Sequence, residues 1–329
     1  MAESDTQTIL VAAVQAEPEW LDLQAAVNKT CSLIRDAAQR GVRLIAFPEC
    51  WIPGYPAWIW TRPVDMERSV AYIRNSLRYD SPEIEKIRTC ALENKINVAL
   101  GFSENDHGSL YIAQCLITDD GEIKAKRRKF KPTHMERTIF GDCTGDSLLN
   151  VVDTSVGRVG ALSCWEHLNP LLKYHTFHQR ELFHVAAWPP VHHHSGGSEF
   201  FSMSREGTRI LSQTYAIESS TFVIHTTSLI SEKGIKTMGT GDGSLMNVPG
   251  GGSSAIFGPD GRQLTDDLPE HEENLVIAEV NTDKILETRC FVDSCGHYSR
   301  PDLLWLGVDL EAKKRVRSQS SPSAHQQDT

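Results

Sequence analysis

The N-terminal part of the chain alternates between short apolar segments and a longer segment with helical spacing. Residues 8–15 (TILVAAVQ) and 42–47 (VRLIAF) are almost continuously apolar, which is typical of strands buried on both faces. Between them, residues 21–40 repeat apolar side chains at helical spacing, and Gly41 follows where such a helix would end. This order predicts a β-α-β unit, so we expect an α/β fold.

The next part of the chain predicts hairpins. A helix is expected over residues 81–94, with Ser81 as its N-cap and Pro82 at its first position. Three strands are then expected at residues 97–102, 110–117 and 123–130, separated by Asp-His-Gly and Asp-Asp-Gly turns. These turns favour an antiparallel meander and argue against a purely parallel sheet.

The second half of the chain again alternates between expected strands and helices, as the N-terminal part does. Strands are expected at residues 156–162, 182–187, 221–227, 254–257 and 275–280. Helices are expected from about residue 170 to 180, over residues 199–218 and, shortly, from Thr282. No linker divides the chain, so we expect one domain over residues 1–310. Residues 311–329, which are basic and then rich in Ser, Gln and Pro, are expected to form a disordered tail.

Composition excludes several classes of partner. The chain has 329 residues, of which 40% are hydrophobic and 23% charged, as in a soluble protein with a sizeable core. Its net charge of -10 argues against nucleic acid or an anionic membrane as a main partner. No apolar run approaches the roughly 20 residues that span a bilayer. The eight cysteines are scattered, and the N-terminus is polar, so we expect reduced thiols in the cytoplasm.

Cys164 is the first candidate for chemistry. It follows the expected strand at residues 156–162 and precedes the helical spacing that begins after Pro170. A strand end holds a nucleophile rigidly while substrate can still reach it, and a nearby helix N-terminus favours thiolate over thiol. Most buried cysteines are structural. The polar Glu166 and His167 that follow are not needed by a core cysteine, and they favour the functional interpretation.

Glu49 and a basic segment are the other candidates. Glu49 ends the strand at residues 42–47, where an apolar surround would raise its pKa toward the range of a general base. A helix cap or an ion pair explains this glutamate equally well. The basic run over residues 127–131 would by itself be read as a solvated face. Strand alternation places Lys129 and Lys131 on one face, however, so one cation can point into a site, and Glu136 could orient it.

These segments together resemble the three motifs of the nitrilase superfamily, in the same order. The matching segments are Pro48-Glu49, residues 128–137 (RKFKPTHMER) and residues 164–167 (CWEH). The last two are most similar to the nitrilase and cyanide-hydratase branch. Residues 296–302 (GHYSRPD) resemble the C-terminal signature of that branch, and the likeness extends over about residues 8–309.

The resemblance implies a fold and a reaction. The fold is an α-β-β-α sandwich that pairs into α-β-β-α-α-β-β-α dimers and often builds spirals or filaments. Glu49 is implied as general base, Lys129 as the cation over the tetrahedral intermediate, Cys164 as nucleophile and Glu136 as the second glutamate. The backbone N–H of Trp165 could join Lys129 in stabilising negative charge on the substrate nitrogen, and Trp165 and Trp188 are expected walls of the pocket. No cofactor or metal is implied.

The expected reaction converts small organic nitriles to carboxylic acids and ammonia through thioimidate and thioester intermediates. The alternative is a cyanide hydratase that forms formamide. The His192-His193-His194 loop departs from the family pattern and leaves the choice of substrate open.

Other classes fit less well. A metal hydrolase is disfavoured because adjacent histidines cannot all turn to one ion, although Cys290, Cys295 and His297 have ligand-like spacing. The chain lacks the G-x-S-x-G motif of many serine hydrolases, and its glycine-rich segments at residues 239–243 and 250–252 lack the context of a phosphate loop. A filament-forming relative with a dead site should have lost Glu49, Lys129 or Cys164, and all three are present.

Overall fold

The computed structural model describes residues 8–314 and 316 and has a single continuous network of strands that folds into two layers. One half follows the order β5 (Ile123–Arg128), β4 (Ser109–Ile117), β3 (Asn97–Asp106), β2 (Leu44–Ala46) and β1 (Thr8–Ala16), and β11 (Asn274–Asn281) pairs with β1. The other half contains β6 (Val151–Thr154), β7 (Gly157–Ser163), β8 (Phe183–Trp188), β9 (Phe222–Ser228) and β10 (Ala255–Phe257). The halves join where the end of β1 pairs with β9.

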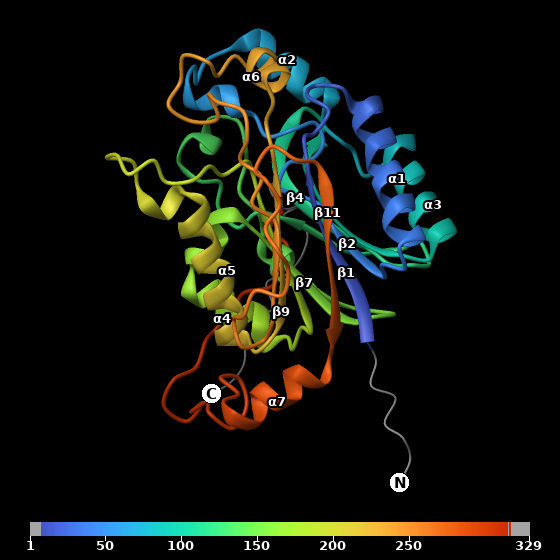
Figure 1. Ribbon diagram of the computed structural model, residues 1–329, viewed down its shortest axis with the longest axis vertical. Coiled ribbons are helices and arrows are strands. Elements are labelled where there is room, and N and C mark those ends of the chain that lie inside the picture. Colours follow the sequence, from blue (N-terminus) through green and yellow to red (C-terminus); the bar gives the residue numbers. More distant parts are fainter. Residues whose placement is uncertain (1–7, 315, 317–329) are drawn as a thin grey trace.

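Helices cover the outer face of each half-sheet. Helices α1 (Leu23–Gln39) and α3 (Pro82–Asn94) lie on one side of the molecule, and α4 (Pro170–His178) and α5 (Arg205–Ser219) lie on the other (Figure 1). Helices α2 (Met66–Asn75) and α6 (Glu232–Met238) lie at one end and α7 (Asp283–Phe291) at the opposite end. No helix in the described ranges is long and apolar enough to cross a membrane.

The layering follows from the alternation of side chains along each strand. On β1, Ile9, Val11 and Ala13 point into the core between the two half-sheets, whereas Ala12, Val14 and Ala16 pack toward α1 and α3. On β8, Phe183, Val185 and Ala187 face the same central core, and Ala186 and Trp188 pack toward α4 and α5. Strands that are apolar on both faces therefore give an α-β-β-α sandwich, which confirms the expected fold.

The local signals in the sequence explain where helices begin. Asp22, Ser81 and Asn169 each accept backbone N–H groups in the first turn of α1, α3 and α4. The meander β3-β4-β5 is antiparallel, as its turns predict. Helix α5 begins at Arg205 and not near residue 199, because Ser204 caps it by accepting the N–H of Gly207.

The structure also corrects the sequence reading. The helices α2 and α6 and the strand β6 were not expected. Strand β5 ends at Arg128, two residues before the end that the sequence predicts. Lys129 and Lys131 therefore do not share one strand face: the side chain of Lys129 is 1% exposed and that of Lys131 is 54% exposed.

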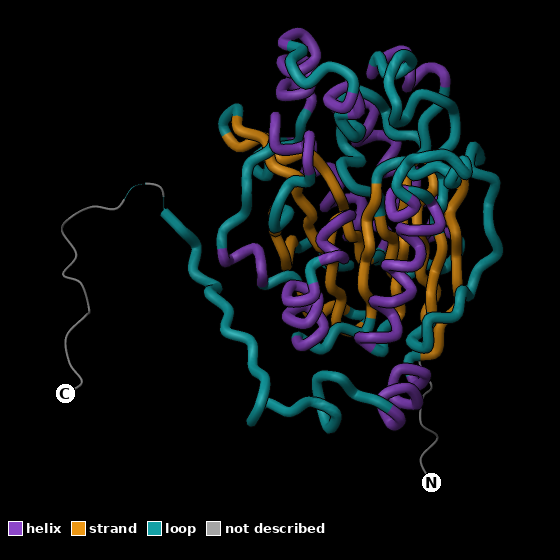
Figure 2. Tube along the Cα trace, turned by 90° about the vertical axis from the view of Figure 1, so that its left-hand side faces the viewer, coloured by secondary structure: helices purple, strands orange, loops and turns teal. Residues whose placement is uncertain are grey.

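After α7 the chain continues as an arm of irregular structure along one side of the molecule (Figure 2). The backbone at Asp309 passes so close to Gly145 that a Cβ at this glycine would lie 2.4 Å from the Asp309 carbonyl oxygen. The prediction of a disordered tail falls mostly on residues 315 and 317–329, which lie outside the described residues. The division into one domain and a tail stays a prediction.

Candidate active site

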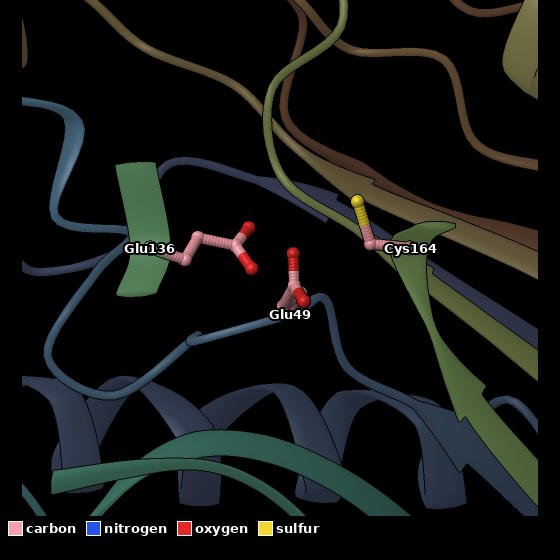
Figure 3. Close-up of side chains that lie close together, drawn as sticks. All are labelled: Glu49, Glu136 and Cys164. Atoms are coloured by element: carbon pink, nitrogen blue, oxygen red, sulfur yellow. The ribbon is translucent and has the colours of Figure 1, made fainter. Parts of the chain in front are cut away.

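Three strand ends bring the candidate residues together. Glu49 follows β2, Lys129 follows β5 directly, and Cys164 follows β7 directly. All three side chains are buried. One ligand atom each from Glu49, Glu136 and Cys164 lies within 4.8 Å of the others, and Figure 3 shows the Glu49 carboxylate between the Glu136 carboxylate and the Cys164 thiol. The structure thus assembles the four residues that the three motifs single out.

Lys129 lies between the two carboxylates. Its Nζ donates to Glu49 Oε1 at 2.7 Å and to Glu136 Oε2 at 2.8 Å. Burial by itself lowers the pKa of a lysine, but here the negative charges of Glu136 and Glu49 dominate and hold the pKa of Lys129 well above its usual value. The side chain is therefore an ammonium ion, fixed in direction by two charge-assisted hydrogen bonds.

Glu49 has the electrostatics of a proton acceptor. Burial raises its pKa to about 8, against the lowering effect of Lys129 and with a further raising effect from Glu136. Its second oxygen, Oε2, has no hydrogen-bond partner among the described residues. One oxygen is thus held by Lys129 while the other is able to take a proton. The direction of this pKa shift agrees with the sequence prediction.

Cys164 is held in an unusual backbone conformation. Its φ is 53°, in the left-handed region that residues other than glycine rarely adopt. Burial and the charge of Glu49 raise its thiol pKa well above the usual value, although Lys129 and the backbone N–H of Trp165 act in the opposite direction. The expected preference for thiolate near a helix start is thus outweighed by burial. The thiol needs a neighbouring base to lose its proton.

Glu136 is fixed by groups that the sequence analysis missed. Its Oε1 accepts from the hydroxyl of Tyr55 at 3.0 Å, and its Oε2 accepts from the backbone N–H of Thr133 at 2.6 Å. The Tyr55 hydroxyl accepts in turn from the indole N–H of Trp60 at 3.1 Å. Four aromatic residues follow Glu49 closely in the sequence and indicate a ligand-binding region, but nothing in the pattern identified Tyr55 as the partner: Trp51, Tyr55, Trp58 and Trp60.

Glu166 joins the strand end that carries Lys129 to the turn that carries Cys164. Its Oε1 accepts from Arg127 and from the backbone N–H of Phe130, both at 2.6 Å. Its Oε2 accepts from the backbone N–H of Ser163 at 2.7 Å. The ion pair with Arg127 is buried, since each side chain is only 2% exposed. Glu166 therefore sets the distance between the cation and the thiol.

The expected pocket walls lie beside Cys164. The indole of Trp165 is partly buried and meets the ring of Trp188 edge to face at 6.5 Å. The indole of Trp188 is fully buried. The backbone carbonyl of Trp188 accepts a hydrogen bond from the N–H of Glu49 at 3.4 Å. The side chain of Trp188 thus supports the site from the core, and its backbone contacts the site.

The three histidines of the 192–194 loop have separate partners. His192 contacts the carbonyl of Val248 at 3.1 Å, His193 pairs with Glu206 at 2.6 Å, and His194 contacts the carbonyl of Glu199 at 3.1 Å. Among the described residues, the only group close enough to share a metal ion is Glu49, Glu136 and Cys164. The ammonium of Lys129 already binds both carboxylates of that group, so its donor set does not fit a resident metal.

Comparison with known proteins agrees with this geometry. Residues 10–289 match the carbon-nitrogen hydrolase family. The chain is 61% identical over 316 residues to an arylacetonitrilase of Aspergillus kawachii, a match that covers 96% of each chain. It is 58% identical over 313 residues to an arylacetonitrilase of Hypocrea virens, a match that covers 95% of each chain.

Solved structures share the fold at low identity. A carbon-nitrogen hydrolase from Helicobacter pylori G27 superposes with a TM-score of 0.68 at 15% identity, over 87% of this chain and 93% of that one. An amidase from Nesterenkonia sp. superposes with a TM-score of 0.61 at 19% identity, over 86% and 94%. The chain belongs to the carbon-nitrogen hydrolase family and is a nitrilase of the fungal type.

Proposed function

We propose that this nitrilase hydrolyses arylacetonitriles to arylacetic acids and ammonia, with Cys164 as nucleophile, Glu49 as general base and Lys129 as the cation that stabilises charge on nitrogen. The observation that carries the roles is the convergence of one thiol, two carboxylates and one ammonium in a buried site. The substrate class rests on the arylacetonitrilases that share 50–61% of their residues with this chain. These relatives do not favour the cyanide-hydratase alternative.

The first half of the reaction forms the covalent intermediate. Glu49 takes the thiol proton of Cys164 as the sulfur attacks the nitrile carbon, and the nitrogen receives that proton, which gives a thioimidate. The negative charge that develops on nitrogen is stabilised by the Lys129 ammonium and by the N–H of Trp165. A soft and strong nucleophile suits this step because a nitrile carbon is a weak electrophile.

The second half consumes two water molecules. Glu49 removes a proton from the first water, which adds to the thioimidate carbon, and the nitrogen becomes protonated. Loss of ammonia leaves a thioester, and a second water releases the acid and restores the thiol. If the tetrahedral adduct breaks its carbon–sulfur bond instead, an amide leaves. We expect acid as the main product and amide as a minor one.

A panel of nitriles tests the substrate class. Phenylacetonitrile, benzonitrile, propionitrile and cyanide are each incubated with the enzyme, and ammonia, acid and amide are measured by NMR. We expect phenylacetonitrile to give the highest kcat/KM and Cys164→Ala to give no product with any of them. Fast formation of formamide from cyanide, with the organic nitriles nearly inert, would contradict the proposal and make the protein a cyanide hydratase.

We also propose a homo-oligomer that pairs through the layer of α4 and α5, which would give the α-β-β-α-α-β-β-α arrangement that the resemblance implies. This layer exposes the large apolar side chains Leu171, Ile210 and Ile217, whereas α1 and α3 together expose only Leu92 of this kind. The C-terminal arm exposes Leu303, Leu304 and Trp305, which could contact a second copy.

Light scattering after size exclusion tests both contacts. Leu171→Lys combined with Ile217→Lys should reduce the mass, and truncation after Asp309 should alter the larger assemblies. Unchanged masses would refute these contacts. The cytoplasm remains the proposed compartment because Cys164 must stay reduced, and all eight cysteines are free thiols.

A further inference from the structure

A buried chain of polar side chains extends away from Cys164 into the layer between β8 and α5. His167 Nδ1 contacts the backbone carbonyl of Cys164 at 2.7 Å, and His167 Nε2 contacts His184 Nε2 at 3.0 Å. His184 Nδ1 then contacts Glu181 Oε2 at 3.0 Å, and the hydroxyl of Tyr215 donates to Glu181 Oε1. All four side chains are fully buried. The reaction proposed above uses none of them.

We infer that His167 is a positioning residue for the backbone N–H of Trp165, and that His184, Glu181 and Tyr215 fix the tautomer in which His167 does this. The inference rests on the proposed role of Cys164 as nucleophile. The carbonyl of Cys164 and the N–H of Trp165 belong to one planar, trans peptide group, so a hydrogen bond that holds the oxygen also sets the direction of the N–H.

The geometry makes this peptide group important for the chemistry. The backbone N–H of Trp165 acts to lower the pKa of the Cys164 thiol. Cys164 keeps its left-handed backbone at φ of 53°, a conformation that persists only when the surroundings hold it. A donor on the carbonyl also polarises the peptide group and makes its N–H a stronger donor. His167 thus acts on the substrate nitrogen through the peptide and does not touch it.

The hydrogen-bond pattern assigns the protons along the chain. A carbonyl oxygen can only accept, so His167 Nδ1 carries a hydrogen. Burial, with a contribution from His184, holds the pKa of His167 well below its usual value, so His167 is neutral and its Nε2 accepts from the N–H at His184 Nε2. One further proton must then lie between His184 Nδ1 and Glu181 Oε2. With that proton in place, every contact in the chain has one donor and one acceptor.

The packing leaves these rings little freedom. The ring of His167 stacks on Trp188 at 5.5 Å, and the ring of His184 stacks on Tyr215 at 3.7 Å. Gly160, which lies opposite His184 on β7, makes room for the carboxylate, because a Cβ there would lie 1.9 Å from Glu181 Oε2. The glycine at position 160, inside β7, is therefore explained by Glu181.

Two pairs of variants test the inference. His167→Asn keeps an amide that can donate to the Cys164 carbonyl, whereas His167→Phe keeps the ring shape without a donor. We expect kcat to fall by about 10- to 100-fold in His167→Phe, with little change in KM, because one charge-stabilising donor is misdirected. His167→Asn should stay within about threefold of wild type, since the hydrogen bond to the carbonyl can form. Glu181→Gln, which can still donate to His184 Nδ1, should retain more activity than Glu181→Leu.

A readout that needs no nitrile separates this inference from the proposed function. The rate of Cys164 alkylation by iodoacetamide is followed against pH, and the profile of His167→Phe should shift to higher pH while that of His167→Asn should not. Equal profiles and equal kcat in the two variants would overturn the inference. If His167→Phe does not fold, ¹⁵N NMR of the wild-type histidines decides, because a hydrogen on His167 Nε2 in place of Nδ1 would refute the assigned tautomer.

Discussion

Replacement of Glu166 by glutamine should lower both the free energy of unfolding and kcat, even though the two side chains have nearly the same shape. The carboxylate receives hydrogen bonds from Arg127 and Phe130 on one oxygen and from Ser163 on the other. A glutamine has one accepting oxygen, so its NH₂ group must face at least one of these donors. The buried guanidinium of Arg127 also loses its only ion-pair partner among the described residues.

The magnitude follows from the burial of the pair. Removal of one partner from a fully buried ion pair costs about 3–5 kcal/mol of the free energy of unfolding, because the remaining charge is left without compensation. For a chain of 329 residues, that loss lowers Tm by about 4–7 °C. The distance between Lys129 and Cys164 should change as well, so we expect kcat to fall by about 10- to 100-fold.

Glu104→Gln is the matched control, because Glu104 pairs with the arginine next to Arg127 on β5. Glu104 pairs with Arg128, the neighbour of Arg127, at 2.7 and 2.8 Å, but Arg128 is 26% exposed and also pairs with Asp106 at 2.9 Å. Because this pair is partly solvated and Arg128 keeps a second carboxylate, neutralising Glu104 should lower the free energy of unfolding by about 1 kcal/mol or less.

Thermal unfolding of both variants at one protein concentration gives the comparison, and hydrogen exchange of the Phe130 and Ser163 amides reports the local effect. Equal and small changes in Tm, with unaltered exchange at these two amides, would refute the argument.

Three further predictions test the site. Cys164→Ala should abolish turnover with the fold intact, and iodoacetamide should label Cys164 in a way that substrate slows; equal, unprotected labelling of Cys50 would contradict this. Lys129→Ala should lower kcat/KM by several orders of magnitude, whereas Lys131→Ala should have little effect because Lys131 is exposed and pairs with the exposed Asp142. A larger loss in Lys131→Ala would reverse the assignment. The pKa of Glu49, raised to about 8 from an ordinary value of 4.5, predicts that kcat/KM rises with pH up to about 8 and then levels off. Because the raised pKa means that the folded state binds the proton more tightly, wild type should lose stability relative to Glu49→Gln as the pH rises from 4.5 to about 8, and parallel stability curves would contradict it.

The sequence predicted the elements whose signals are local. Continuous apolar runs predicted the buried strands, Ser81 was predicted as the N-cap of α3, and the helical spacing after Pro170 predicted α4; the structure confirms these helix starts. Helix α2 was not predicted because most of its apolar side chains do not face the core. Met66 and Val70 are exposed, and Tyr72 is the one fully buried residue of this helix. Helix α6 has seven residues and contains Gly234, so its periodicity is too short to read.

The sequence motifs predicted the reacting groups of the site but not the residues that hold them in place. The three motifs led to Glu49, Lys129, Glu136 and Cys164, which the structure brings together. The choice of Lys129 rested on the resemblance. The separate expectation that Lys129 and Lys131 share one strand face was wrong, since the strand ends at Arg128, and the backbone N–H of Lys129 donates to the carbonyl of Ile112 at 2.7 Å. Tyr55 and Glu181 were missed because their partners are distant in the sequence. Tyr55 contacts a residue 81 positions away, and Glu181 contacts one 34 positions away, and no spacing rule connects such pairs.

The charges of the site explain how a thiol with a raised pKa can serve as the proposed nucleophile. Two carboxylates and one ammonium give the buried site a net charge of one negative unit, and burial of that charge raises the pKa of Glu49 and opposes formation of a second anion at Cys164. A free thiolate is therefore costly. When the proton moves from Cys164 to Glu49 during attack, however, the total charge does not change, and the new negative charge appears on the substrate nitrogen next to Lys129. A buried site can thus exclude water and still form the sulfur–carbon bond, provided that proton transfer and attack occur together.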